Sequence, residues 1–102
     1  MNTINGFEAL ARMHELRNTG ETFELRHLTF NRRTEESNGM RIVRHCKTRP
    51  SLPQERFDVC AELYLPYTDL AAPVENQNRE CRKRLIRYVA FPPKYELLKV
   101  VW

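Results

Sequence analysis

The chain is poor in glycine and has no long apolar run. Its three glycines, Gly6, Gly20 and Gly39, stand apart, so a glycine-rich phosphate-binding loop is excluded. The longest uncharged apolar run is only a few residues, which is too short to span a membrane. No basic start followed by an apolar core opens the chain, and this favours a cytoplasmic protein without a secretory signal.

Cysteine and histidine are too few and too dispersed for the common metal sites. Cys46, Cys60 and Cys81 are odd in number and widely spaced, which favours free thiols in a cytoplasmic protein. Zinc ligands come in closely spaced pairs, and none is present. His45 and Cys46 are adjacent, so on a strand they would point to opposite faces. We therefore expect no metal and no cofactor.

Residue patterns typical of catalysis are also missing. Neighbouring carboxylates on one strand face would raise the pKa of the Cys60 thiol. Cys81 lies in a basic block that would favour its thiolate, but it stands alone there. Glu35 and Glu36 adjoin at an expected wet turn, where carboxyl groups keep ordinary pKa values. We predict that the chain is not an enzyme.

Composition and charge are those of a small globular protein. With 102 residues, 41% of them hydrophobic and 29% charged, the chain is expected to form a single domain, residues 1–102. Its net charge is +4, and its basic residues are 13 arginines against four lysines. Guanidinium groups suit bidentate contacts with carboxylates and phosphates.

Apolar spacing predicts one helix near the start of the chain, over residues 6–18. Asn5 is the expected N-cap, with Glu8 placed for a capping box and Gly20 for a left-handed stop. After Gly20 the period changes to two, which predicts a hairpin of residues 22–31 and 40–47 around Asn38-Gly39. A phase slip within its first strand indicates either a bulge near His27 or a strand exposed differently at its two ends.

The second half reads as strands separated by loops. Alternation over residues 57–65 predicts a strand that ends at Pro66, followed by a long loop from Thr68 to Asn78. A second hairpin is expected from residues 85–91 and 95–102, both nearly continuous in apolar character and so buried on both faces. The predicted fold is α+β: an N-terminal helix packed on a small twisted antiparallel sheet of about five strands.

Basic residues gather in two blocks, at residues 41–49 and 79–87. Alternating arginines with aromatic neighbours such as Tyr88 would suit single-stranded nucleic acid. The alternative is a solvated strand face neutralised by carboxylates on neighbouring strands. The candidate nucleic-acid-binding residues are Arg41, Arg44, Arg82, Arg84 and Arg87.

The apolar end of the chain offers a different surface. An ordered Trp102 must pack on the helix or on another subunit. Val100 and Trp102 are therefore candidates for self-association.

Three segments resemble short uncharacterised proteins encoded in prophages and mobile elements of gut Bacteroidetes. They are Phe23–Thr34 with Asn38-Gly39-Met40, then Arg82–Arg87, and finally Lys99–Trp102. The similarity covers about two-thirds of the chain. This sequence departs from the pattern at Pro92-Pro93-Lys94, where a glycine-bearing turn is typical, and in the long segment from Thr68 to Asn78. The resemblance implies an accessory or structural part of a phage or mobile element, and no activity.

Two functions follow as expectations. The first is a non-enzymatic interaction protein that associates with itself or docks onto a protein partner through its apolar last strand and open sheet edges. The second is a module that binds single-stranded nucleic acid.

Overall fold

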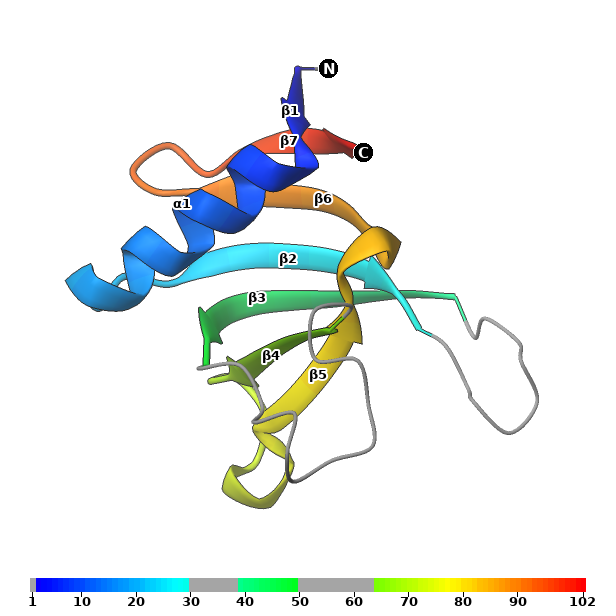
Figure 1. Ribbon diagram of the computed structural model, residues 1–102. Helices are drawn as coiled ribbons and strands as arrows, with labels where there is room; N and C mark the ends of the chain where they lie inside the picture. Colours follow the sequence, from blue (N-terminus) through cyan, green and yellow to red (C-terminus); the bar gives the residue numbers. More distant parts are fainter. Residues whose placement is uncertain (1, 30–38, 50–63) are drawn as a thin grey trace, which may run out of the picture.

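The computed structural model describes residues 2–29, 39–49 and 64–102. One helix, α1 (Gly6–Thr19), lies across one face of a twisted seven-stranded sheet (Figure 1). The strands follow the spatial order β1-β7-β6-β2-β3-β4-β5. Their bounds are β1 Thr3–Asn5, β2 Phe23–Leu28, β3 Met40–Thr48, β4 Tyr64–Asp69, β5 Asn78–Arg82, β6 Ile86–Phe91 and β7 Glu96–Val101. The α+β class is confirmed, and the sheet is larger than expected.

The ends of α1 are set by the residues that the sequence predicted. The Asn5 side chain accepts a hydrogen bond from the Phe7 amide at 2.8 Å, and so caps the first turn. Gly20 adopts a left-handed conformation with φ of 80°, and its N–H donates to the Leu16 carbonyl. Ala9, Leu10 and Met13 form the buried stripe of the helix.

Both predicted hairpins are present. β2 pairs antiparallel with β3, and β6 pairs antiparallel with β7. The register of β2 against β6 shifts between Arg26 and His27, close to the predicted bulge, but the extra residue is Arg87 of β6, and β2 itself alternates without a slip. The shift places Ile86 opposite His27, and both side chains are buried. The expected burial of β7 on both faces is wrong, because Val100 is its one buried residue.

Two strands escaped prediction. β1 is only three residues long and pairs parallel with β7, so the sheet is mixed rather than wholly antiparallel. β5 is a polar strand at the edge of the described sheet, and Cys81 is its one buried residue. An edge strand with one buried side chain does not produce the apolar alternation that marks an inner strand.

The region around Pro66 also differs from expectation. β4 runs through Pro66 to Asp69. A proline has no N–H to donate, but its carbonyl can still accept, and here it accepts a hydrogen bond from the Arg49 amide at 3.0 Å. The expected loop from Thr68 to Asn78 is therefore shorter, and it contains the 3₁₀ helix η2 (Val74–Asn76). The expected strand over residues 57–63 and the turn at 31–38 lie outside the described residues.

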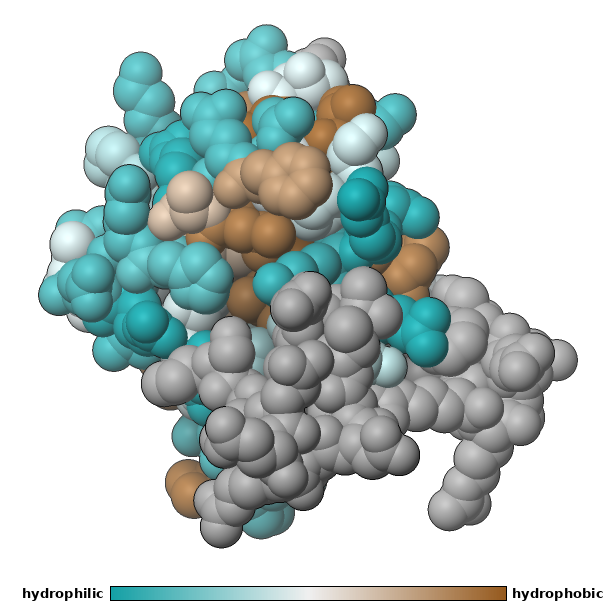
Figure 2. All heavy atoms as spheres, in the orientation of Figure 1, coloured by the Kyte–Doolittle hydropathy of each residue, from teal (hydrophilic) through white to brown (hydrophobic). Residues whose placement is uncertain are grey.

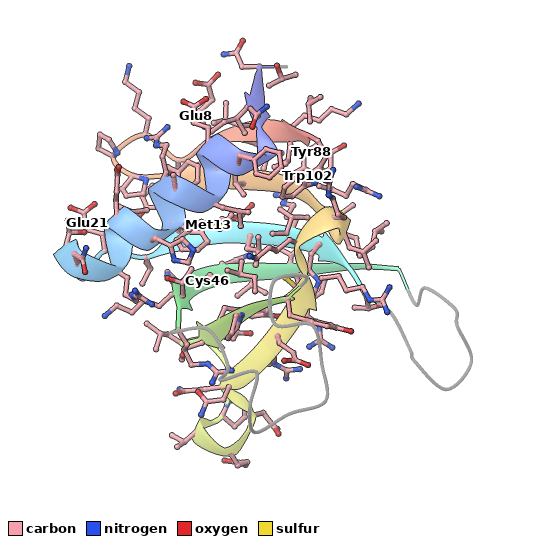
Figure 3. The ribbon with its side chains drawn as sticks, in the orientation of Figure 1. Glu8, Met13, Glu21, Cys46, Tyr88 and Trp102 are labelled. Carbon is pink, nitrogen blue, oxygen red and sulfur yellow. The ribbon has the colours of Figure 1, made fainter. Side chains whose placement is uncertain are left out.

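The core lies between α1 and the sheet, and Figure 3 shows Met13 and Cys46 in this layer. Its fully buried side chains come from the helix and from four strands, β2, β3, β4 and β6: Met13, Phe23, Leu25, Val43, Cys46, Leu65, Tyr67, Ile86 and Val89. On the face seen in Figure 2, apolar residues reach the surface in patches bordered by polar ones. None of the helices in the described part of the chain has the length and apolar character that a bilayer crossing requires.

Candidate functional site

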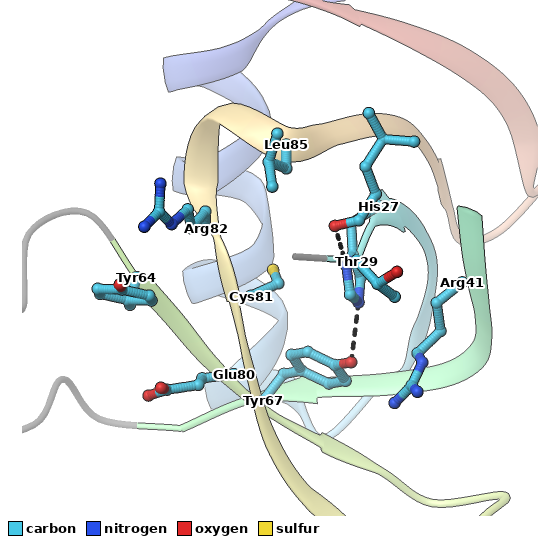
Figure 4. Close-up of a pocket in the computed structure, with 10 residues that line it drawn as sticks. His27, Thr29, Arg41, Tyr64, Tyr67, Glu80, Cys81, Arg82 and Leu85 are labelled. Atoms are coloured by element: carbon cyan, nitrogen blue, oxygen red, sulfur yellow. Dashed lines mark hydrogen bonds between the residues drawn. The ribbon is translucent and has the colours of Figure 1, made fainter. Parts of the chain in front are cut away.

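A polar cavity lies between the β2–β3 pair and the β4–β5 pair. β3 and β4 pair antiparallel at only three positions, Cys46–Thr48 with Tyr67–Asp69, and Arg41 lies in the part of β3 beyond this ladder. The cavity has a volume of about 230 Å³, and we call it the wedge pocket (Figure 4). Its walls come from β2, β3, β4, β5 and the 3₁₀ helix η3 (Lys83–Leu85). The lining residues are His27, Leu28, Thr29, Arg41, Tyr64, Tyr67, Glu80, Cys81, Arg82 and Leu85.

A buried histidine–tyrosine pair forms the floor of the wedge pocket. His27 Nε2 and the Tyr67 hydroxyl are 2.9 Å apart, and His27 Nδ1 lies 3.1 Å from the Leu28 carbonyl. A carbonyl can only accept, so Nδ1 carries the proton and Nε2 accepts from the tyrosine O–H. The pair joins β2 to β4 across the intervening β3, which shows how strongly the sheet curls at this point.

Burial keeps both partners neutral. His27 is 4% exposed and Tyr67 is fully buried. Desolvation lowers the pKa of His27, and the guanidinium groups of Arg41 and Arg79 lower it further. Desolvation also raises the pKa of Tyr67 well above its usual range. The imidazole is therefore uncharged near neutral pH, with both ring nitrogens engaged.

Arginines surround this pair. In Figure 4, Arg41 lies on one side of the pocket and Arg82 on the other, with the His27–Tyr67 pair between them. The guanidinium of Arg82 lies 5.9 Å from the centre of the Tyr64 ring. Behind the floor, the Arg49 guanidinium donates to the backbone carbonyls of Tyr67 and of the residue opposite it in β5. Glu80 is the one carboxylate among the lining residues.

The expectation that Cys81 sits in surroundings favouring its thiolate is wrong. Cys81 is 6% exposed, and burial, with a smaller contribution from Glu80, raises its pKa to about 12. Burial likewise raises the pKa of Cys46. Cys46 is buried while His45 is exposed, as expected for adjacent strand residues. Within residues 2–29, 39–49 and 64–102, no group of three metal-ligating side chains occurs. Cys60, Glu35 and Glu36 lie outside those ranges.

A second surface is the sheet face opposite α1, which we call the helix-free face. The ladders align Lys99, Tyr88, Arg26 and Ile42 in one row across β7, β6, β2 and β3. The helix packs against the other face, where the neighbouring residues Val100, Val89 and Val43 are buried. Tyr88 is partly exposed, so an aromatic ring stands between two cationic side chains on an accessible sheet surface.

One carboxylate belongs to this face. Glu24 accepts from Arg26 Nε at 2.8 Å and from Arg44 at 3.3 Å. The basic residues of the helix-free face on β2, β3 and β7 include Arg26, Arg44 and Lys99, and Lys47, which alternates with the buried Cys46 and Thr48, points to the same side. The exposed apolar side chains Met40 and Ile42 adjoin this charge cluster.

The five arginines proposed from the sequence are dispersed over three places. Arg41 and Arg82 line the wedge pocket, and Arg44 lies on the helix-free face. Arg84 belongs to η3, where its guanidinium lies 5.3 Å from the centre of the Trp102 ring. Arg87 donates to the Arg84 carbonyl at 2.9 Å. These residues do not share one strand face, and their role in binding nucleic acid stays a prediction.

The last residues of the chain pack against its own helix and core. Trp102 packs on the first turn of α1, edge-on to Phe7 at 5.8 Å, and its Nε1–H donates to the Ile86 carbonyl (Figure 3). Val100 is buried in the core. The indole therefore packs on the helix, which was one of the two expected positions. Self-association through Val100 and Trp102 stays a prediction.

Comparison of the chain with protein-family models, with curated proteins and with solved structures gave no match. The similarity to prophage proteins stays a prediction.

Proposed function

We propose that this chain is a non-enzymatic binding domain whose helix-free face binds single-stranded nucleic acid. The observation that carries the proposal is the cross-strand row in which Tyr88 lies between Arg26 and Lys99. A base stacked on an exposed aromatic ring contributes about 1–3 kcal/mol, whatever its identity. Flanking cations attract the phosphates on either side of that base.

The charge on this face supports the same partner. The carboxylate of Glu24 is shared between Arg26 and Arg44, so it offsets only part of their charge. Lys99 adds a further exposed positive charge. A single strand whose phosphates contact Arg26, Arg44 and Lys99 would release about two counterions on binding. Each phosphate contact contributes about −0.7 to the slope of the logarithm of the binding constant against the logarithm of the salt concentration.

The test is fluorescence anisotropy with a labelled single-stranded oligonucleotide of about 12 nucleotides, within the range of site sizes for such domains. Raising the salt from about 50 to 200 mM should weaken binding by about 20-fold, as three phosphate contacts require. Tyr88→Ala should weaken it by about 10-fold, and Tyr88→Phe should retain most of the affinity because the ring is kept. Undetectable binding at the lower salt would overturn the proposal.

A matched pair of charge variants isolates the face. Lys99→Gln and Arg17→Gln each remove one positive charge, but Arg17 lies in the last turn of α1. Lys99→Gln should reduce the salt slope by about 0.7, while Arg17→Gln should leave it unchanged. Equal effects of the two variants would indicate attraction to net charge alone and would contradict a defined face.

Docking of a protein partner is the second candidate, and the exposed apolar side chains favour it. Met40 and Ile42 are each 45% exposed, although both belong to a regular strand. A second copy of this chain covering them would bury that apolar surface. Light scattering over a range of concentrations would then show a mass that doubles, and Ile42→Glu should restore the monomer. A constant monomer mass would argue against self-association.

A further inference from the structure

The wedge pocket has features that the helix-free face does not explain. Two arginines from distant blocks, Arg41 and Arg82, line one small cavity with a single carboxylate, Glu80. Arg79 stands opposite Tyr67 in the β4–β5 ladder, and its charge and that of Arg41 both act on the His27–Tyr67 pair. Like charges gathered around a partly enclosed cavity repel one another more strongly than they would in water.

One buried donor on β5, opposite Tyr67 in the ladder, is left without a partner in the described part of the chain. The Nε of Arg79 is buried, and within the described part of the chain it makes no hydrogen bond. A buried donor on a charged group is costly to leave unpaired, and an anionic oxygen is the acceptor that satisfies it best.

The remaining polar groups do not favour a cation or a nucleophilic reaction. The Tyr67 hydroxyl and both nitrogens of His27 are engaged with each other and with the Leu28 carbonyl. Cys81 is a buried thiol whose pKa is raised by burial. Among the lining residues, Arg41 and Arg82 carry the positive charge, and the ligand chemistry that matches guanidinium groups is an oxyanion.

We propose that the wedge pocket is an oxyanion-binding site that takes a phosphate group between Arg41 and Arg82. A volume of about 230 Å³ leaves room for a small organic group attached to that phosphate. Tyr64 and Leu85 provide aromatic and apolar walls for it. The proposal does not depend on nucleic-acid binding by the helix-free face.

The histidine–tyrosine pair links this site to pH. When His27 becomes protonated, Nε2 turns from acceptor to donor, so the Tyr67 hydroxyl must accept and its own proton becomes available to the pocket. The cations that face His27, Arg41 and Arg79, oppose its protonation, and an oxyanion between the arginines counteracts them. The other charged groups that line the pocket are Glu80 and Arg82. Oxyanion binding should therefore strengthen as the pH falls.

The experiment is a calorimetric titration of the full chain with sodium phosphate and with sodium sulfate at constant ionic strength, using sodium chloride as the reference. Phosphate and sulfate should bind and chloride should not. Arg41→Gln should weaken the binding of phosphate and of sulfate by 10-fold or more. Arg44 lies on the same strand but on the helix-free face, so Arg44→Gln should leave both affinities unchanged. No binding of either oxyanion, or equal binding by the two variants, would overturn the proposal.

Two further arms define the ligand and the pH linkage. If a nucleoside 5′-monophosphate binds more tightly than inorganic phosphate, the organic group in the pocket belongs to a nucleotide. If the two affinities are equal, the site takes free phosphate. Sulfate does not titrate between pH 5.5 and 8, so its affinity should rise on acidification for the native chain and stay constant for His27→Gln. Tyr88→Ala should leave phosphate binding intact, which separates this site from the helix-free face.

Discussion

At the residue scale, the unusual group is His27, a neutral imidazole in a largely apolar core. Its side chain lies on the same face of β2 as the buried Phe23 and Leu25, and Tyr67 from β4 completes its hydrogen bonding. A buried polar side chain is tolerated when all its polar atoms are paired, as they are here. These two hydrogen bonds fix the tautomer of His27 and the orientation of the Tyr67 hydroxyl, and they link β2 to β4.

His27 makes stability depend on pH. Its pKa in the folded chain is lowered from 6.5, chiefly by burial, so the unfolded chain takes up the proton first as the pH falls. The free energy of unfolding should therefore decrease from about pH 6.5 downwards. Urea unfolding at pH 7.5, 6.5 and 5.5 measures this slope.

The control for that slope is the other perturbed imidazole. The pKa of His14 is also lowered, by partial burial and then by Arg17 and Lys83, so it contributes in the same direction. His27→Gln should flatten the slope more than His14→Gln, since His27 is the more deeply buried. An unchanged slope in His27→Gln would show that folding does not shift the pKa of this imidazole.

The role of a residue could be predicted from the sequence only where its interaction partners are close to it along the chain. The caps of α1 were predicted because Asn5 and Gly20 act on amides within a few positions. The wedge pocket was not predicted, because His27, Tyr67 and Arg41 come from three strands and meet only through the curl of the sheet. Cys81 was misjudged for the same reason, since its charged sequence neighbours do not determine its buried surroundings.

At the element scale, the strands that were predicted are those with regular apolar alternation or a clear turn. β2, β3, β6 and β7 met this condition, and β1 and β5 did not. β1 is too short for any period to register, and β5 is polar because it lies at the edge. Their positions depend on partners distant in sequence, β7 and β4, and no local propensity specifies such pairing.

The contact between α1 and the end of β7 can be tested at Gly6. A Cβ built on Gly6 would overlap the six-membered ring of Trp102, so Gly6→Ala should force the indole away. Overpacking of this kind costs about 1–3 kcal/mol, against a gain of up to about 1 kcal/mol from the better helix propensity of alanine. Unfolding in urea, followed by circular dichroism, measures the difference.

A double-mutant cycle separates the two effects. In a Trp102→Ala background, Gly6→Ala should be neutral or stabilising, because the overlap is gone and only helix propensity remains. If Gly6→Ala destabilises both backgrounds equally, the close approach of the indole to the first turn is not what requires glycine.

At the scale of the whole molecule, the first and last segments depend on each other. β1 has β7 as its one partner among the described strands, in a parallel register from Thr3 with Lys99 to Asn5 with Val101. The same last residues bring Val100 into the core and Trp102 onto α1. The helix therefore reaches the sheet through its own buried stripe and through contacts that both ends of the chain supply.

Deleting Lys99–Trp102 tests this dependence. The truncated chain loses the partner of β1, a buried valine and the indole that packs on α1. Cooperative unfolding should therefore be lost, or the melting temperature should fall by more than about 10 °C. A loss of about 2–3 kcal/mol produces such a shift in a domain of this size. Circular dichroism melts measure it. The paired substitution Val100→Ala with Trp102→Ala keeps the backbone of β7, and it should give an intermediate loss. A truncated chain that melts within a few degrees of the full chain would show that α1 and the other six strands fold without the closing strand, and that the last residues are available to a partner after all.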